Sequence, residues 1–162
     1  MIADAMYQLL KYAHIVGASV LLGTGAGIAF FMLMAHRMRD PAIVAGVARI
    51  VVIADFLFTA SAVLLQPITG FLLAWWAGYS LTDGWIVLSI VLYLITGAFW
   101  VPVVFMQIRM RDLAIRAASE GSPLPDAYHR IFWRWFIFGF PAFAAVLAIF
   151  WLMIARPHIS FA

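Results

Sequence analysis

The chain has 162 residues, of which 67% are hydrophobic and 10% are charged, and it contains no cysteine. A typical soluble domain is about 45–50% apolar and about 25% charged, so the excess apolar surface here requires lipid as its solvent. The lack of cysteine excludes disulfides, cysteine-ligated clusters and thiolate zinc sites, and no phosphate-binding loop or hydrolase motif is present.

Four long apolar segments predict an all-α membrane protein, an antiparallel bundle of four transmembrane helices. The chain is expected to form one integral membrane domain over residues 1–162, with spans at about 12–35, 50–76, 85–108 and 135–155. The third helix is expected to continue to about Ala118, because residues 107–118 are mostly good helix formers.

Positive side chains are distributed unequally between the two ends of these spans. Of the 10 Lys and Arg residues, all except Lys11 and Arg156 flank the first and third connections. The positive-inside rule therefore places both termini outside and the arginine-rich connections in the cytoplasm of a bacterial inner membrane. The aromatic belts are expected at Trp75, Trp76, Tyr79, Trp85 and Trp151 outside, and at Trp133 and Trp135 inside.

His14 is the main candidate for a functional side chain, because an ionisable group inside an apolar span is costly. On a helical projection it shares a face with small residues that leave space beside the ring for a flat macrocycle. That face consists of Gly17, Ala18, Leu21, Gly25, Ile28 and Met32. A second interpretation is that His14 makes only a polar contact at the interface beside Lys11. His158, at roughly the depth of His14, and Met153, a turn or so deeper, are candidate second ligands.

Another face of the first span carries Gly23 and Gly27, a spacing that is typical of close helix packing. This pair indicates either a homodimer or a contact within one subunit.

The second and third spans each carry a polar face. In the second span, the residues within about 40° of a common line at 3.6 residues per turn are Asp55, Thr59, Ala62, Gln66, Thr69 and Leu73. In the third span, the comparable face consists of Tyr93, Thr96, Gly97, Trp100 and Gln107. Pro67 and Pro102 free the backbone carbonyls of Val63 and Ala98. These faces predict either a pocket or a structural hydrogen-bond network between helices.

Sulfur and imidazole side chains gather at the cytoplasmic ends of the first and third spans. They are Met32, Met34, His36, Met38, Met106 and Met110. Such ligands suit Cu(I), although methionine in a lipid-facing helix is more simply an apolar filler.

The opening of the chain resembles a known family. The segment Leu9-Leu10-Lys11-Tyr12-Ala13-His14-Ile15-Val16-Gly17-Ala18, followed by Leu22-Gly23-Thr24-Gly25, is similar to the first span of family 2269 of the domains of unknown function. Gln66-Pro67-Ile68-Thr69-Gly70 and the stretch from Phe99 to Asp112 look like its other hallmarks. The likeness covers nearly the whole chain and implies a small bacterial membrane protein, without an activity.

More distantly, the opening is similar to that of the copper-resistance D proteins, of the membrane part of a urate oxidase and of small haem-associated membrane protoporphyrinogen oxidases. In the last group the resemblance implies a link to haem b through the counterpart of His14. That group also relies on a basic residue in a later span, and the third span of this chain has none.

The leading hypothesis is a b-type haem-binding inner-membrane protein with a redox role in electron transfer or in quinone- or porphyrin-linked oxidation, which would make it a membrane oxidoreductase. Its predicted haem b site consists of His14 as metal ligand with Gly17, Ala18, Gly25, Gln66, Trp100 and His158.

Two alternatives belong to other classes. One is a transporter or channel for a metal ion or small solute, whose polar interior would consist of Asp55, Thr59, Gln66, Thr69, Tyr93 and Thr96. The other is a structural or assembly subunit of a membrane complex. The expected partners are the lipid bilayer, a second copy of the chain and a quinone or redox partner, with no nucleic acid.

Overall fold

The computed structural model describes residues 2–160, and every regular element in this range is helical. The elements are α1 (Ile2–Met38), α2 (Pro41–Ala54), the π-helix η1 (Asp55–Thr59), α3 (Ala60–Trp76), α4 (Gly84–Ser119) and α5 (Asp126–Ala155). Because η1 joins α2 to α3 without a break, the chain makes four helical passes, each long and apolar enough to cross a membrane. The predicted all-α bundle of four spans is confirmed.

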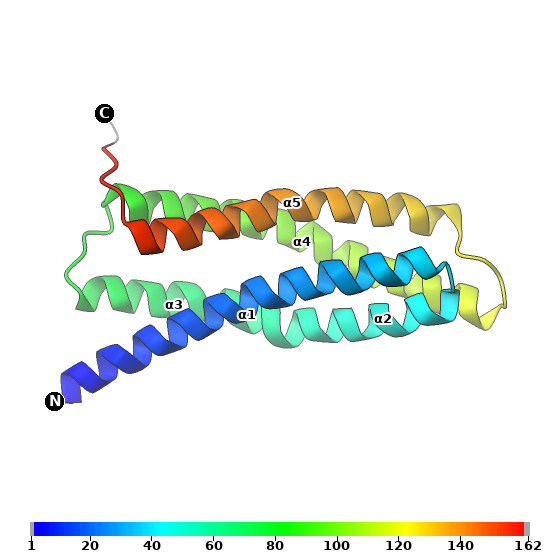
Figure 1. Ribbon diagram of the computed structural model, residues 1–162, viewed down its shortest axis with the longest axis horizontal. Helices are drawn as coiled ribbons and strands as arrows, with labels where there is room; N and C mark the ends of the chain where they lie inside the picture. The colour runs from blue at the N-terminus through cyan, green and yellow to red at the C-terminus, as the bar shows by residue number, and fades with distance from the viewer. Residues whose placement is uncertain (1, 161–162) are drawn as a thin grey trace.

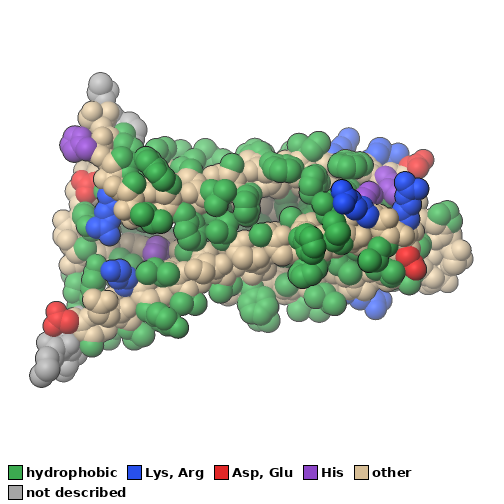
Figure 2. Space-filling view, viewed as in Figure 1, with side chains coloured by type: hydrophobic (Ala, Val, Ile, Leu, Met, Phe, Trp, Pro, Cys, Tyr) green, Lys and Arg blue, Asp and Glu red, His purple; other side chains and the backbone are tan. Residues whose placement is uncertain are grey.

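The two ends of the bundle differ in what they carry. The terminal end holds both chain termini and the connection between α3 and α4 (Figure 1). The arginine end holds the other two connections, and most of the Lys and Arg side chains gather there (Figure 2). This agrees with the unequal distribution of charge that the sequence shows.

The connections contain residues that begin or end the helices. At the start of α2, Asp40 Oδ1 accepts hydrogen bonds from the backbone N–H groups of Ala42 at 2.8 Å and Ile43 at 3.3 Å, and Pro41 follows as the first helical residue. Gly78 and Gly121 follow the ends of α3 and α4 with positive φ angles of 72° and 62°. Both positions are left-handed, a conformation that favours glycine.

The helices extend beyond the expected spans. α1 begins at Ile2 instead of near residue 12, and α5 begins at Asp126 instead of near residue 135. Hydrophobicity sets where lipid begins, whereas a helix continues until a cap or a turn residue stops it. The expected extension of the third helix is confirmed, because α4 ends at Ser119.

A packed apolar core fills the arginine half of the bundle, where α1, α2, α4 and α5 meet. Its fully buried side chains include Met32, Val44, Met110, Tyr128 and Phe132. Trp135 also belongs to this core and is only 4% exposed. The expectation that Trp135 lies at the membrane interface is therefore wrong.

The terminal half is divided into two helix pairs. α1 packs against α3, and α4 packs against α5, while α3 is barely in contact with α4 or α5 within the described residues. The pairs diverge toward the terminal end (Figure 1), and the surface is hollowed between them (Figure 2). We call this recess between the α1–α3 pair and the α4–α5 pair the wedge.

Tyr93 joins the two pairs. Its hydroxyl on α4 donates a hydrogen bond to the backbone carbonyl of Val63 on α3. Val63 lies four residues before Pro67, which has no N–H to donate to that carbonyl. The carbonyl that the sequence predicted to be free is therefore bonded by a side chain from the neighbouring helix.

We predict that Tyr93→Phe lowers the free energy of unfolding by about 1–3 kcal/mol, because it leaves the Val63 carbonyl without a partner in an apolar environment. Denaturant unfolding in detergent micelles measures the change. Tyr12→Phe is the matched control, since Tyr12 is 67% exposed. Equal stability of the two variants would contradict the assigned role of Tyr93.

Candidate functional site

His14 lies on α1, is half-buried, and is oriented by α3. Its Nδ1 is 2.7 Å from the hydroxyl of Thr69. That hydroxyl has one proton and lies 2.8 Å from the carbonyl of Leu65 in its own helix. When Thr69 donates to Leu65, its oxygen can only accept from His14, so the proton of the imidazole is assigned to Nδ1.

The other ring nitrogen of His14 is left unprotonated. Nε2 has no hydrogen-bond partner among the described residues, and it is not a buried atom. A neutral imidazole that donates through one nitrogen and presents the lone pair of the other is the arrangement found in histidine ligands of metals. The second interpretation from sequence, a polar contact only, is also consistent with the Thr69 bond.

Two glycines allow α1 and α3 to approach closely at this point. A Cβ at residue 17 would lie 2.5 Å from Gln66 Nε2, and a Cβ at residue 70 would lie 3.3 Å from His14 Cε1. The Gln66 side chain therefore lies over Gly17, while the His14 ring lies over Gly70. Gln66 Nε2 also donates to the backbone carbonyl of His14 at 3.0 Å. The space predicted beside Gly17 is thus occupied by the Gln66 amide.

The other predicted cofactor residues are distributed more widely. Ala18 and Gly25 are partly exposed on α1, and a Cβ added at Gly25 would meet nothing within 4 Å. His158 is exposed in the segment after α5. Trp100 is engaged elsewhere, by Asp55. Of the predicted set, the structure brings only Gln66 into contact with His14, and Gly17 lies against the Gln66 amide.

A second polar group lies nearer the middle of the bundle and links three passes. Asp55 is 3% exposed, and its Oδ1 accepts from Trp100 Nε1 at 3.2 Å. The amide of Gln107 lies between Asp55 and Trp135. The orientation of this amide is assigned from Trp135, whose indole N–H can only donate. With the amide oxygen facing Trp135 Nε1 at 3.3 Å, the amide nitrogen faces Asp55 and donates to Oδ2 at 3.0 Å.

The polar face predicted for the second span is divided between these two groups. Asp55 turns toward α4, whereas Gln66 and Thr69 turn toward α1. On α4, the Thr96 hydroxyl donates to its own helix, at the carbonyl of Leu92. Thr59 is buried in η1. The polar side chains thus form two separate hydrogen-bonded groups, and the transporter interpretation remains a prediction.

The sequence interpretation missed Trp135 as a member of the second group. Its indole N–H could have indicated this role, because an indole N–H that is buried in an apolar helical bundle needs a hydrogen-bond acceptor. Gln107 was on the predicted polar face of the third span, but its partner on α5 was not foreseen.

The methionine and histidine cluster at the arginine end contributes mainly to packing. Met32 and Met110 are fully buried in the apolar core, whereas Met38 is 62% exposed. The ring of His36 stacks on Phe132 with 3.7 Å between centroids. Within residues 2–160, no group of three His, Asp or Glu side chains is placed to hold a metal ion.

Gly23 and Gly27 do not pack against another helix of the same subunit. A Cβ at residue 23 would meet nothing within 4 Å, and one at residue 27 would meet only Phe31 of its own helix. The alternative of a contact within one subunit is therefore wrong, and the homodimer remains a prediction.

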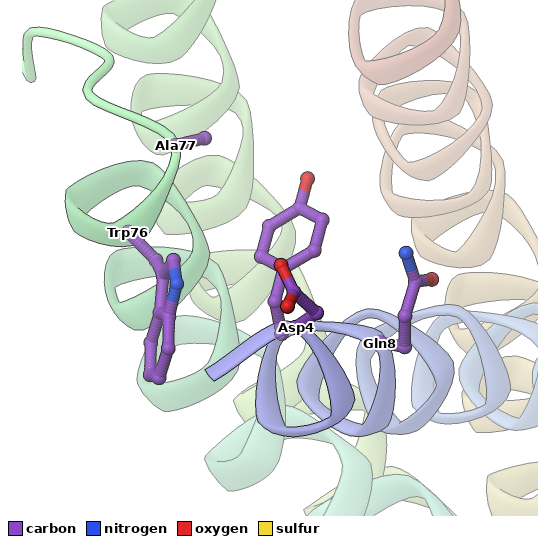
Figure 3. A pocket seen from close by; sticks show the side chains of 5 residues that line it. Asp4, Gln8, Trp76 and Ala77 are labelled. Atoms are coloured by element: carbon purple, nitrogen blue, oxygen red, sulfur yellow. The ribbon is translucent and has the colours of Figure 1, made fainter. Parts of the chain in front are cut away.

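A pocket at the terminal end was not predicted from the sequence. It lies between the start of α1 and the end of α3 and has a volume of about 240 Å³. Its lining consists of Asp4, Tyr7, Gln8, Trp76 and Ala77 (Figure 3). It contains none of the predicted cofactor residues.

The fold and these two polar groups define an integral membrane protein built on a four-pass helical bundle. Residues 8–157 match the model of a family described as "Predicted integral membrane protein (DUF2269)". The chain belongs to this family, as its resemblance in sequence implied. Searches of curated proteins and of solved structures found no match.

We predict that Gly17→Ala is less stable than Gly23→Ala by about 1 kcal/mol, the typical net contribution of one hydrogen bond. Both variants gain the same intrinsic helix propensity, but only the first displaces Gln66 from the His14 carbonyl. The free energies of unfolding of the two variants in detergent provide the comparison. A Gly17→Ala protein as stable as Gly23→Ala would show that this contact does not hold α1 against α3.

Proposed function

We propose that this protein is a b-type haem-binding membrane protein with a redox role, and that His14 Nε2 is an axial ligand. The observation that carries the proposal is the hydrogen bond from His14 Nδ1 to Thr69, which fixes the ring and leaves Nε2 with its lone pair. When bound, haem b would supply one-electron transfer.

The donor chemistry around His14 fits such a group, but the space beside Gly17 does not, because the Gln66 amide fills it. A macrocycle bound to His14 would therefore occupy the wedge, where the two helix pairs diverge. The hydrogen bond to Thr69 would fix the orientation of the His14 ring, and Gln66 would hold α1 at a fixed distance from α3.

The proposal includes the finer expectations from the sequence. The arginine end would face the cytoplasm of a bacterial inner membrane, so that His14 lies in the outer half of the bilayer. The electron partner would be a quinone or a redox protein. The open surface at Gly23 favours a homodimer, because that glycine has no partner within the subunit.

We predict that the protein purified in detergent from cells supplied with haem shows a Soret band and a positive pyridine haemochrome test. His14→Ala should lose the band, because the axial nitrogen is removed. Thr69→Val should retain the ligand but weaken haem affinity by about 10–100-fold, the usual effect of losing a hydrogen bond to a metal-bound histidine.

The control is His129→Ala, which removes an imidazole from α5 near the arginine end, outside the predicted haem site, and should leave the spectrum unchanged. A wild-type protein without a Soret band, or an unaltered band in a folded His14→Ala protein, would eliminate the proposal. A spectrum changed by His158→Ala as strongly as by His14→Ala would instead assign a second axial ligand to the segment after α5.

A further inference from the structure

Asp55 is the only acidic side chain inside the described part of the four apolar spans that is buried, and it lies at the first residue of η1. π-helical segments are rare and often accompany functional sites. The residues that follow Asp55 in η1 include Phe56 and Phe58, which are exposed on the surface of the bundle. The Asp55 side chain therefore points into the bundle, whereas Phe56 and Phe58 of the same π-helical turn lie on its outer surface.

The hydrogen bonds of Asp55 match an ionised carboxylate. Both oxygens accept N–H groups, one from Trp100 and one from Gln107. The orientation of the Gln107 amide follows from Trp135, whose indole N–H can only donate and so faces the amide oxygen. Three passes of the bundle are thereby joined through one carboxylate.

The charge on this carboxylate has no paired cation in the described residues. No ionisable side chain lies on α3. The other helices around Asp55 carry the following: Asp4, Tyr7, Lys11, Tyr12, His14, His36 and Arg37 on α1, Arg49 on α2, Tyr93, Arg109, Arg111, Asp112 and Arg116 on α4, and Asp126, Tyr128, His129, Arg130 and Arg134 on α5. None of these arginines is buried. An unpaired carboxylate at this depth is strongly disfavoured by loss of hydration, whereas a proton removes the charge.

Protonation of Asp55 would change the hydrogen bond that the Gln107 amide makes with this carboxyl group. A protonated Asp55 carries an O–H donor that needs an acceptor, and the amide oxygen of Gln107 becomes that acceptor when the amide turns over. The same rotation brings the amide N–H₂ toward the indole N–H of Trp135, which then loses its acceptor. The amide thus has two orientations, each suited to one protonation state of Asp55.

We infer that Asp55 is a proton-binding site in the membrane interior, and that its occupancy sets the orientation of Gln107 and the hydrogen bond of Trp135. The ligand is the proton itself, which adds to Oδ2 and cancels the charge. This inference concerns a different group from His14 and does not depend on the binding of haem.

The first experiment is infrared difference spectroscopy of the full chain in lipid bilayers, between alkaline and acidic buffers. The wild-type protein should show a protonated-carboxyl C=O stretch, together with changes in a glutamine amide band and an indole N–H band. Asp55→Asn should lose all three changes. Asp112→Asn, which alters an exposed acid at the arginine end, should keep them.

Trp135→Phe separates the two parts of the inference. It keeps an aromatic ring but removes the indole N–H, so the carboxyl signal should remain and the indole signal should disappear. A carboxyl signal that persists in Asp55→Asn overturns the proton site. A carboxyl signal from Asp55 without any change at Trp135 overturns the coupling through Gln107.

A second measurement on the wild-type protein applies if Asp55→Asn fails to fold. A lipid-soluble carbodiimide adds to a protonated carboxyl group in an apolar environment and forms a stable N-acylurea. Mass spectrometry should locate the adduct on Asp55, and its yield should fall as the pH rises. Labelling confined to the exposed acids, or labelling of Asp55 that is independent of pH, overturns the inference.

Discussion

Water is absent from the interior of a bilayer, so a polar group buried there must find its partner on another helix. Several contacts between the helices of this protein depend on such a partner. Thr69 and Gln66 fix α3 against α1, Tyr93 joins α4 to α3, and Asp55 holds Trp100. Leucine and acyl chains are equally apolar, so helix association in a bilayer depends on close packing and on hydrogen bonds between helices. These hydrogen bonds therefore act together with the apolar core to align the four passes.

The same bonds divide the molecule into two regions with different properties. The arginine half has a continuous apolar core, and Gln107 joins that core to Asp55 at its inner boundary. The terminal half consists of two pairs that are joined by Tyr93 and, at the terminal end, by the contact of Arg156 with Tyr79.

The architecture could be predicted from the sequence, because hydrophobic length and arginine placement are strong signals over about 20 residues. The freed carbonyl of Val63 could also be predicted, since proline always removes a donor. The division of the second span's polar face between the Asp55 group and the His14 group could not be predicted. The projection that aligned Asp55 with Thr69 assumed 3.6 residues per turn throughout, whereas η1 inserts an additional residue between them. Trp135 was misplaced because an aromatic residue near a span end fits either an interface or a core.

One inserted residue corresponds to about 100° of helical rotation. A chain without the insertion in η1 would keep the same hydrophobic profile and the same four passes, yet its carboxyl group would leave α4 while Thr69 still faced His14. Loss of a single codon would therefore break the Asp55 group without altering the topology or the His14 group. Alignments of related chains should consequently be examined for a gap at this position before the acid is treated as equivalent among them.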